Sequence, residues 1–312
     1  MKIKYGIIAT AAISKRFVGA VSKTNGEVIA VGSRSYKSAK DFADEFSILK
    51  AYGSYEEVYQ DSEVNTVYIA TINNQHIAEI KKALSYGKHV LCEKPLGLNV
   101  KEVQEVFNIA KENGLFIMEM QKSIFLPITT IIKEYIDTKT LGDLHQISMS
   151  ASFDSPTATW MHEPTQGGVV YGSASYTFEY LDYLLEPRDT VVQALTTKED
   201  SGTIDAVNMN IKMDEVLITS HISMKGTSES YATFYFEKGY ITTDSYWKAR
   251  KCQIYIDKQC QIIDKPVEYE MEYELTHVES CLENGLLESL VMPKERTLRC
   301  IQWVEEIMNK QY

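Results

Sequence analysis

Several motifs that mark common enzyme sites are missing from this sequence. Its six histidines show no metal-ligand spacing such as HExxH, so we expect no metal site. The GxSxG turn that presents a nucleophilic serine does not occur, and neither does the lysine-containing loop of P-loop proteins. Hydrolase and P-loop functions therefore lack support in the sequence.

Cysteine and long apolar runs are also scarce. Five cysteines form no CxxC pair, and such an odd, scattered set is typical of a reducing compartment. No apolar run approaches the roughly 18 residues that a membrane-spanning helix needs. The first strand is predicted already at residues 3–8, so we expect no signal peptide, no membrane partner and a cytoplasmic protein.

Positive charge is in deficit. The 32 Lys and Arg residues stand against 43 Asp and Glu residues, which gives a net charge of −11. This balance argues against non-specific binding to nucleic acid. At 312 residues the chain is long for one core, so we expect two domains.

Predicted strands alternate with helices through residues 1–120. Short apolar runs predict strands at 3–8, 27–33, 65–70, 89–92 and 115–118. Apolar residues at helical spacing lie between them, and such alternation is typical of βαβ units with a parallel sheet. We therefore predict that residues 1–120 form a doubly wound, dinucleotide-binding α/β domain.

Residues 121–312 have a different pattern, which predicts an α+β domain. Helices are predicted after Pro127, at Ser173–Leu185 and at 294–310, whereas strand follows strand between about 190 and 265. Apolar and polar residues alternate in these strands, which indicates an antiparallel sheet. We expect this domain to bind substrate.

Two segments of this domain raise further expectations. Val267–Leu275 alternates apolar residues with four glutamates, and we expect a solvated edge strand there rather than a metal site. Ala232–Phe236 is apolar on both faces, which predicts that something covers its outer side. A second subunit is one candidate for that cover.

The segment Lys88–Leu98 contains a short apolar run that ends at Glu93, Lys94 and Pro95. Such a run is typical of a buried strand in a parallel sheet, and ligands lie outside the carboxyl ends of these strands. Proline restricts the backbone of Lys94. A lysine near apolar walls and a bound cation loses part of its proton affinity, which suits it for proton transfer. A surface lysine in a turn is the alternative.

A turn for the pyrophosphate of a dinucleotide is predicted after the first strand. The residues at this turn are Ala9, Thr10, Ala11, Ala12 and Ile13. The dinucleotide fingerprint has glycines where Ala9 and Ala11 stand. Alanine can form the turn where φ is negative, and it costs about 1 kcal/mol where a left-handed residue is required. The alternative is a turn with only a structural role.

The residues after the second strand indicate which dinucleotide the chain prefers. Ser33 and Arg34 follow this strand, and Lys37 is close by. An acidic residue there would accept the ribose 2′-hydroxyl, whereas arginine accommodates a 2′-phosphate. This favours NADP, with NAD possible, and an ordinary loop arginine is the alternative.

Taken together, these motifs resemble the Gfo/Idh/MocA family (glucose–fructose oxidoreductase, inositol dehydrogenase and relatives). The densest match is YGSYEEVYQDSEVNTVYIATINNQHIAEIKKALSYGKHVLCEKPLGLN at 52–99, with GIIATAAIS at 6–14 and SRS at 33–35. Looser matches are FLP at 125–127, LGDL at 141–144 and WMHEPTQGGVVYGSASY at 160–176. The segment THVESCLENGLLES at 276–289 resembles the dihydrodiol-dehydrogenase-like branch. The resemblance covers essentially the whole chain.

The resemblance implies a Rossmann domain, followed by a domain with a large open, mostly antiparallel sheet. It implies NAD(P)-dependent oxidation of an alcohol, or the reverse reaction, and a homodimer that pairs through the open sheet. It places Lys94 beside the nicotinamide ribose and the substrate hydroxyl, commonly with a cis bond to Pro95. The family's second acid/base position falls on Tyr176.

The chemistry explains why such a pair is needed. An alcohol cannot release hydride unless its O–H proton leaves in step, so a base must contact that oxygen. A tyrosine with a pKa of about 10 is a poor base at neutral pH unless a cation stabilises the phenolate. Lys94 supplies that charge in this hypothesis, and Tyr176 is the acid in the reductive direction. A core tyrosine is the alternative for Tyr176.

Further site residues are expected from the resemblance. Thr71, Asn73, His76 and Glu93 are predicted on the nicotinamide side. For His76, a role in the first turn of the following helix is the alternative. Trp160 and His162 are predicted for the substrate wall, with a core tryptophan as the alternative.

Two further positions depart from the family pattern and leave two functions open. Gly172 stands where the pattern has an aspartate, and Ile124 where close relatives have an arginine. The leading hypothesis is an oxidoreductase acting on a small sugar, polyol or dihydrodiol-like alcohol or its carbonyl. The alternative is a cofactor-binding sensor or regulatory protein on the same fold.

Overall fold

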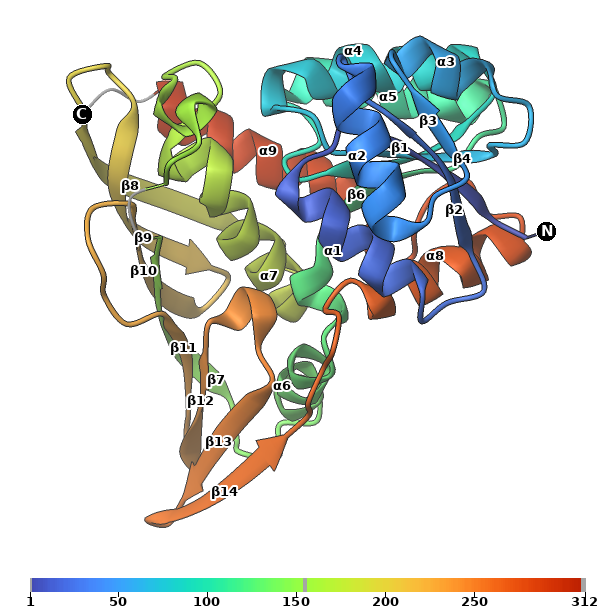
Figure 1. Cartoon of the computed structure of the whole chain (residues 1–312). Coiled ribbons are helices and arrows are strands. Elements are labelled where there is room, and N and C mark those ends of the chain that lie inside the picture. The colour runs from blue at the N-terminus through green and yellow to red at the C-terminus, as the bar shows by residue number, and fades with distance from the viewer. Residues whose placement is uncertain (1, 154–155, 310–312) are drawn as a thin grey trace. The chain divides into compact units, whose positions relative to one another are not determined.

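The computed structural model describes residues 2–153 and 156–309. The chain divides into two compact units, coloured by residue number in Figure 1. The first unit consists of Met1–Gln121 and Tyr269–Leu298, and the second of Lys122–Glu268 and Arg299–Tyr312. Residues 269–298, which the sequence analysis placed in the segment 121–312, therefore pack within the first unit.

The first unit contains a six-stranded parallel sheet in the order β3-β2-β1-β4-β5-β6. Its strands are β1 (Lys4–Ile8), β2 (Glu27–Gly32), β3 (Lys50–Tyr52), β4 (Thr66–Ile69), β5 (His89–Glu93) and β6 (Ile117–Met120). Its helices include α1 (Ala12–Val21), α2 (Tyr36–Phe46), α3 (Tyr55–Gln60), α4 (His76–Ser85), α5 (Val100–Glu112) and α8 (Glu272–Glu283). The strand order reverses between β1 and β4, which is where doubly wound sheets bind nucleotides. The predicted fold class of this part is confirmed.

Two details of this sheet differ from the prediction. The last strand runs two residues further along the chain than the predicted 115–118. Strand β3 and helix α3 were not predicted, because the three residues of β3 and the six of α3 are too short for a periodic pattern.

The second unit contains an eight-stranded sheet in the order β14-β13-β12-β11-β7-β10-β9-β8. Its strands are β7 (Leu144–Ser152), β8 (Thr190–Lys198), β9 (Ile204–Met213), β10 (Val216–Ser223), β11 (Tyr231–Phe236), β12 (Gly239–Asp244), β13 (Lys251–Ile256) and β14 (Gln259–Asp264). All neighbours are antiparallel except β7 and β10. The predicted α+β class with a mostly antiparallel sheet is confirmed.

Helices α6 (Pro127–Asp137), α7 (Ser175–Leu185) and the second-unit part of α9 (Lys294–Asn309) cover one face of this sheet. Ile132, Phe178 and Trp303 of these helices belong to the same buried cluster as Ile147 and Phe234 of the strands. Figure 1 shows α6 and α7 on that face. The other face, here called the outer face, carries the alternate side chains of each strand.

Strand β11 contains the segment Ala232–Phe236. Ala232, Phe234 and Phe236 are buried on the helix-covered face. On the outer face, Thr233 is buried and its hydroxyl bonds that of Thr242 at 2.9 Å.

The predicted edge strand at Val267–Leu275 is wrong. Helix α8 begins at Glu272, and Glu274 is buried rather than solvated. Met271, Leu275 and Val278 are buried at spacings of four and three residues, which is helical. The alternation of apolar residues and glutamates overlapped with this helical pattern, and it suggested the wrong period.

Contacts with α1 explain why this segment returns to the first unit. A Cβ on Gly19 would collide with the ring of Tyr269, so the missing side chain makes room for that ring. The guanidinium of Arg16 forms an ion pair with the carboxylate of Glu270. The Gly26 N–H donates to Glu279 at 2.7 Å. Residues 269–283 therefore pack along α1 and the turn that follows it.

Candidate active site

Lys94 follows directly after β5, at the carboxyl end of the parallel sheet. Three residues of this strand, Val90, Leu91 and Cys92, are fully buried. The strand therefore ends abruptly at the surface of the sheet, and Lys94 is half-buried there. Its bond to Pro95 is cis, as the resemblance implies.

Side chains from neighbouring strands hold the residues on both sides of Lys94. The hydroxyl of Tyr68 on β4 donates to the Glu93 carboxylate at 2.6 Å. Tyr68 is fully buried, and burial raises the pKa of its hydroxyl. The Leu96 N–H donates to Oε1 of Glu119, a fully buried residue of β6, at 2.8 Å. The Glu93 side chain before Lys94 and the Leu96 backbone after it are thus both tied to the sheet.

Histidine 76 lies at the start of α4 and is fully buried. Its Nδ1 is 2.8 Å from the Pro95 carbonyl oxygen, and its Nε2 is 3.0 Å from that of Thr71. Burial lowers the pKa of His76, although both carbonyl contacts act in the opposite direction. Its two ring nitrogens therefore face the backbone.

The other residues predicted on the nicotinamide side follow β4. Asn73 is buried at the start of a short 3-10 turn, η1 (Asn73–Gln75). The hydroxyl oxygen of Thr71 is buried and has no hydrogen-bond partner among the residues that the structure describes. A buried hydroxyl in this state can still bind a polar group of a ligand.

The predicted pyrophosphate turn has one alanine in the left-handed region. Ala9 has φ +81°, whereas Ala11 has an extended backbone with φ −70°. The Ala9 N–H donates to the Gly32 carbonyl at 3.0 Å, and the Ser14 hydroxyl donates to the Ala9 carbonyl at 2.8 Å. Only the first alanine therefore takes a conformation that favours glycine.

The N-terminus of α1 follows this turn. Ala12 is exposed, and Thr10 and Ile13 are partly exposed. Within the described chain, no side chain caps this terminus and its first turn contains no acidic residue. Backbone N–H groups at such a terminus attract anions. The turn therefore fits a pyrophosphate.

The residues after β2 present positive charge. Ser33 is buried, and Arg34 and Lys37 are exposed. The Lys37 ammonium pairs with Asp41 at 2.6 Å, one helical turn further on. No acidic side chain lies between Ser33 and Lys37. This loop therefore contains no carboxylate for a ribose 2′-hydroxyl.

Tyr176 belongs to the second unit, at the second residue of α7, and is half-buried. The Lys122 ammonium nitrogen lies 5.7 Å from the centre of its ring, and the Trp247 ring is centred 6.4 Å away. Lys122 is only 5% exposed. Sequence reasoning missed both neighbours, because Lys122 and Trp247 are far from Tyr176 along the chain and share no motif with it.

The two positions that depart from the family pattern also lie in the second unit. Gly172 lies in a π-helical turn, Val170–Ala174, before α7. A Cβ at Gly172 would lie 2.9 Å from the methyl carbon of Met161, so a larger side chain must displace this methionine. Ile124 is buried in the core.

The predicted substrate-wall residues lie in a short 3-10 turn, Thr159–His162. Trp160 is partly exposed. Nδ1 of His162 is 3.0 Å from the Glu199 carboxylate, and its Nε2 is 2.8 Å from the Pro156 carbonyl oxygen. The Pro156 carbonyl and then Glu199 raise the pKa of His162. These bonds tie the turn to the residue after β8.

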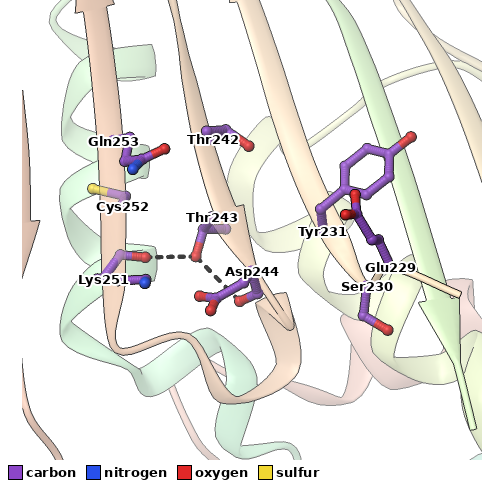
Figure 2. Close-up of a pocket in the computed structure, with 9 residues that line it drawn as sticks. All are labelled: Glu229, Ser230, Tyr231, Thr242, Thr243, Asp244, Lys251, Cys252 and Gln253. Carbon is purple, nitrogen blue, oxygen red and sulfur yellow. Dashed lines mark hydrogen bonds between the residues drawn. The ribbon is translucent and has the colours of Figure 1, made fainter. Parts of the chain in front are cut away.

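One pocket, of about 360 Å³, lies on strands β11 to β13 of the second unit (Figure 2). Its lining residues are Glu229, Ser230, Tyr231, Thr242, Thr243, Asp244, Lys251, Cys252 and Gln253. Tyr231, Thr242 and Gln253 project from the outer face, and the Thr243 hydroxyl donates to the Lys251 carbonyl at 2.8 Å. None of the residues predicted for the site lines this pocket.

Two family descriptions match consecutive parts of the chain. Residues 3–120 match "oxidoreductase family, NAD-binding Rossmann fold", and residues 130–242 match "GFO/IDH/MocA C-terminal domain". The chain belongs to the Gfo/Idh/MocA family of oxidoreductases. The resemblance inferred from its motifs is confirmed.

Individual relatives agree with this membership. The trans-1,2-dihydrobenzene-1,2-diol dehydrogenase of Mus musculus is 30% identical over 98% of this chain and 96% of that protein. The protein of the same name from Homo sapiens is 27% identical over 98% of this chain and 96% of its own.

Solved structures share the fold. A 3-ketoreductase from Actinomadura kijaniata in complex with TDP-benzene and NADP superimposes with a TM-score of 0.87 at 20% identity, over 98% of this chain and 96% of that chain. An aldose–aldose oxidoreductase from Caulobacter crescentus has a TM-score of 0.89 at 17% identity, over 99% of this chain and 97% of that chain.

Two further classes of feature are absent from the described part of the chain. No helix there has the length and apolar character to cross a lipid bilayer. No group of three or more His, Cys, Asp or Glu side chains there could hold a metal ion.

Proposed function

We propose that the chain is an NADP-preferring oxidoreductase that transfers hydride between nicotinamide and a small sugar, polyol or dihydrodiol-like alcohol or its carbonyl. The observation that carries this proposal is the anchored lysine after β5: a buried hydroxyl of β4 holds the Glu93 side chain before Lys94, and a buried carboxylate of β6 holds the Leu96 N–H after it. Such restraint suits a group that must meet a reacting oxygen. The diol dehydrogenases among its relatives support the alcohol or carbonyl substrate.

Different residues of the first unit would contact different parts of a dinucleotide. The turn at Ala9–Ile13 and the N-terminus of α1 would hold the pyrophosphate, and Thr71 and Asn73 would contact the nicotinamide side, with Glu93 close to Lys94. When bound, the nicotinamide ring supplies the hydride donor or acceptor. Arg34 would pair with a 2′-phosphate, for which the exposed positive charge after β2 is the support.

Lys94 and Tyr176 would handle the proton. In reduction, the Tyr176 hydroxyl donates a proton to the carbonyl oxygen as hydride arrives, and in oxidation it withdraws the proton. Positive charge nearby stabilises the phenolate that must form. Lys94 is one source in this proposal, and the buried Lys122 ammonium, 5.7 Å from the ring, is a second. The aromatic face of Trp247 would form part of the substrate wall, together with Trp160 and His162.

Reduction of a carbonyl panel tests the enzymatic proposal. NADPH is mixed with the protein and a set of ketoses, inososes and diketones, and the loss of absorbance is followed for the wild type and Lys94→Ala. We expect turnover that falls at least about a hundredfold in the variant, because a general acid/base group is lost. The control is Lys101→Ala, which removes an exposed lysine of α5 and should leave turnover unchanged. Equal rates for both variants would remove Lys94 from the mechanism.

A second candidate function is a dinucleotide-binding sensor without turnover. It is favoured by Gly172 and Ile124, because one position is packed against Met161 and the other lies in the core. Tight binding of NADPH with no turnover on any member of the panel would favour this sensor.

Cofactor preference is tested by titration with NADPH and NADH. We expect Arg34→Ala to weaken NADPH binding by about tenfold or more and to leave NADH binding unchanged, because only NADPH has the 2′-phosphate. Lys37→Ala should have a smaller effect, since Asp41 already pairs with this ammonium. Equal affinities of the wild type for both cofactors would contradict the preference.

We also propose a homodimer that forms through the outer face of the second-unit sheet. Large apolar side chains exposed on this face are Val191, Leu195, Leu217, Tyr240 and Ile262. A face of this kind commonly marks an interaction surface. Sedimentation should give a dimer for the wild type and a monomer for Leu217→Glu. The control Leu49→Glu, at an exposed leucine of the first unit, should remain dimeric.

A further inference from the structure

The peptide group between Pro95 and Leu96 is held at both of its polar ends. Nδ1 of His76 lies 2.8 Å from its carbonyl oxygen, and Oε1 of Glu119 accepts its N–H at 2.8 Å. Because a peptide group is planar and rigid, two such bonds fix its position and its orientation. Lys94 precedes Pro95 directly, so this peptide group determines where the backbone of Lys94 lies.

The same histidine also reaches the end of the neighbouring strand. Its Nε2 lies 3.0 Å from the carbonyl oxygen of Thr71, which follows β4, whereas Pro95 follows β5. The imidazole therefore lies between the carboxyl ends of two adjacent strands. The ring is fully buried, so water does not compete for either contact.

The chemistry of the two contacts indicates where the ring proton lies. A carbonyl oxygen only accepts hydrogen bonds, so the ring nitrogen must donate, and a neutral imidazole has only one N–H group. Burial lowers the pKa of His76, which favours the neutral ring. The tautomer with the proton on Nδ1 is the one that bonds the Pro95 carbonyl, which is the shorter of the two contacts.

We propose that His76 is a positioning residue for Lys94: its Nδ1–H holds the Pro95–Leu96 peptide, and this bond keeps the lysine backbone in its reactive place. The inference rests on the proposed function for its effect on turnover. It differs from the expectation that His76 contacts the nicotinamide, because here the ring acts on the protein backbone alone.

Two substitutions separate the two contacts. The side-chain amide nitrogen of asparagine occupies nearly the place of Nδ1, whereas that of glutamine reaches the place of Nε2. His76→Asn therefore keeps a donor for Pro95, and His76→Gln keeps a donor only for Thr71. His89→Gln serves as a control, since Nδ1 of His89 accepts the Phe116 N–H at 2.9 Å and contacts the other end of β5.

Three measurements are made on the full-length variants: amide hydrogen exchange of the segment 93–99, kcat with NADPH and a carbonyl substrate, and affinity for NADPH. We expect exchange about tenfold faster and kcat at least about tenfold lower in His76→Gln, because a shifted lysine reacts poorly. In His76→Asn and His89→Gln both quantities should stay within about threefold of the wild type. NADPH affinity should change less than threefold in all variants.

Other outcomes would overturn the proposal. Equal behaviour of the asparagine and glutamine variants would contradict it, and so would faster exchange with unchanged kcat. Loss of NADPH affinity in both variants would assign His76 to the cofactor instead. If both variants unfold, the histidine maintains the whole fold and the proposal is wrong.

Failure of the proposed function gives a different result. If the wild type reduces no carbonyl, that function fails, and hydrogen exchange alone decides on the anchoring role of His76. Slow exchange in His76→Asn with fast exchange in His76→Gln would then support it, and equal exchange would overturn it.

Discussion

Substitution by glycine should stabilise the fold at Ala9 and destabilise it at Ala11. Ala9 has φ +81°, and a left-handed backbone costs an alanine roughly 1–2 kcal/mol that glycine does not incur. Glycine also gains conformational freedom in the unfolded chain, which costs about 0.4–1 kcal/mol of stability. The difference leaves a net stabilisation of about 0.5–1 kcal/mol for Ala9→Gly.

Ala11 provides the matched control. Its φ of −70° suits alanine, so Ala11→Gly relieves no strain and incurs only the cost in the unfolded chain. We expect this substitution to destabilise by about 0.4–1 kcal/mol. The two variants should thus differ by about 1–2 kcal/mol, although they lie two residues apart and change the same atoms.

The assay must report on the first unit. All three tryptophans, at 160, 247 and 303, lie in the second unit, so tryptophan fluorescence would follow the wrong part of the chain. Urea-induced unfolding is therefore followed by hydrogen exchange of amides in β1 and β4. The bonds from Ala9 N–H to Gly32 and from Ser14 to the Ala9 carbonyl remain possible in both variants. Destabilisation by Ala9→Gly, or equal effects of the two substitutions, would refute the reasoning.

Three further predictions concern other parts of the fold. Gly19→Ala should destabilise the first unit by about 1–3 kcal/mol, because the new Cβ collides with the Tyr269 ring, and denaturant unfolding should show recovery when Tyr269→Leu is added. Lys88→Met should lower the free energy of unfolding by about 2 kcal/mol in the same assay. The buried Lys88 ammonium donates to the carbonyls of residues 61 and 64, and these carbonyls lose their partner in the variant. The contribution of His162 should depend on pH. Its pKa is raised in the folded chain by the Pro156 carbonyl and Glu199, so the stabilisation is complete below the unfolded value of about 6.5 and is lost as pH rises through the raised pKa. Unfolding of the wild type and His162→Gln at several pH values should therefore converge at alkaline pH.

Controls distinguish these effects from general damage. Failure of Tyr269→Leu to rescue Gly19→Ala would place the cost elsewhere in α1. Lys101→Met, at an exposed lysine, should leave stability unchanged. A constant difference between wild type and His162→Gln across the pH range would show that packing rather than charge carries the effect of His162.

Local patterns in the sequence were enough to predict most of the fold. Apolar runs identified β1, β2, β4 and β5, because a strand buried on both faces must be apolar throughout. Helical spacing of apolar residues identified α6, α7 and α9 for a similar reason, since each buries one side. Alternation of apolar residues with glutamates wrongly predicted a strand over Val267–Leu275, because Met271 and Leu275 also satisfy helical spacing. In the folded chain this segment packs on α1, where Gly19 leaves room for the Tyr269 ring.

The residue types of the candidate site were also predictable, but their partners were not. Lys94 could be singled out because a proline and a buried strand flank it in the sequence. The sequence could not show that His76 lies between two backbone carbonyls, because Thr71 and Pro95 come together only when β4 and β5 lie side by side. Lys122 approaches Tyr176 in the same way, through packing of segments far apart in the chain.

The sequence by itself thus determined the fold class, most of the elements, the family and the position of the lysine. The tertiary structure alone decided which alanine is left-handed, what holds the lysine backbone, and which cation lies beside the tyrosine ring. The physical reason is range: periodicity and turn chemistry act between residues a few positions apart, whereas hydrogen bonds and charge act between atoms that only folding brings within a few ångströms.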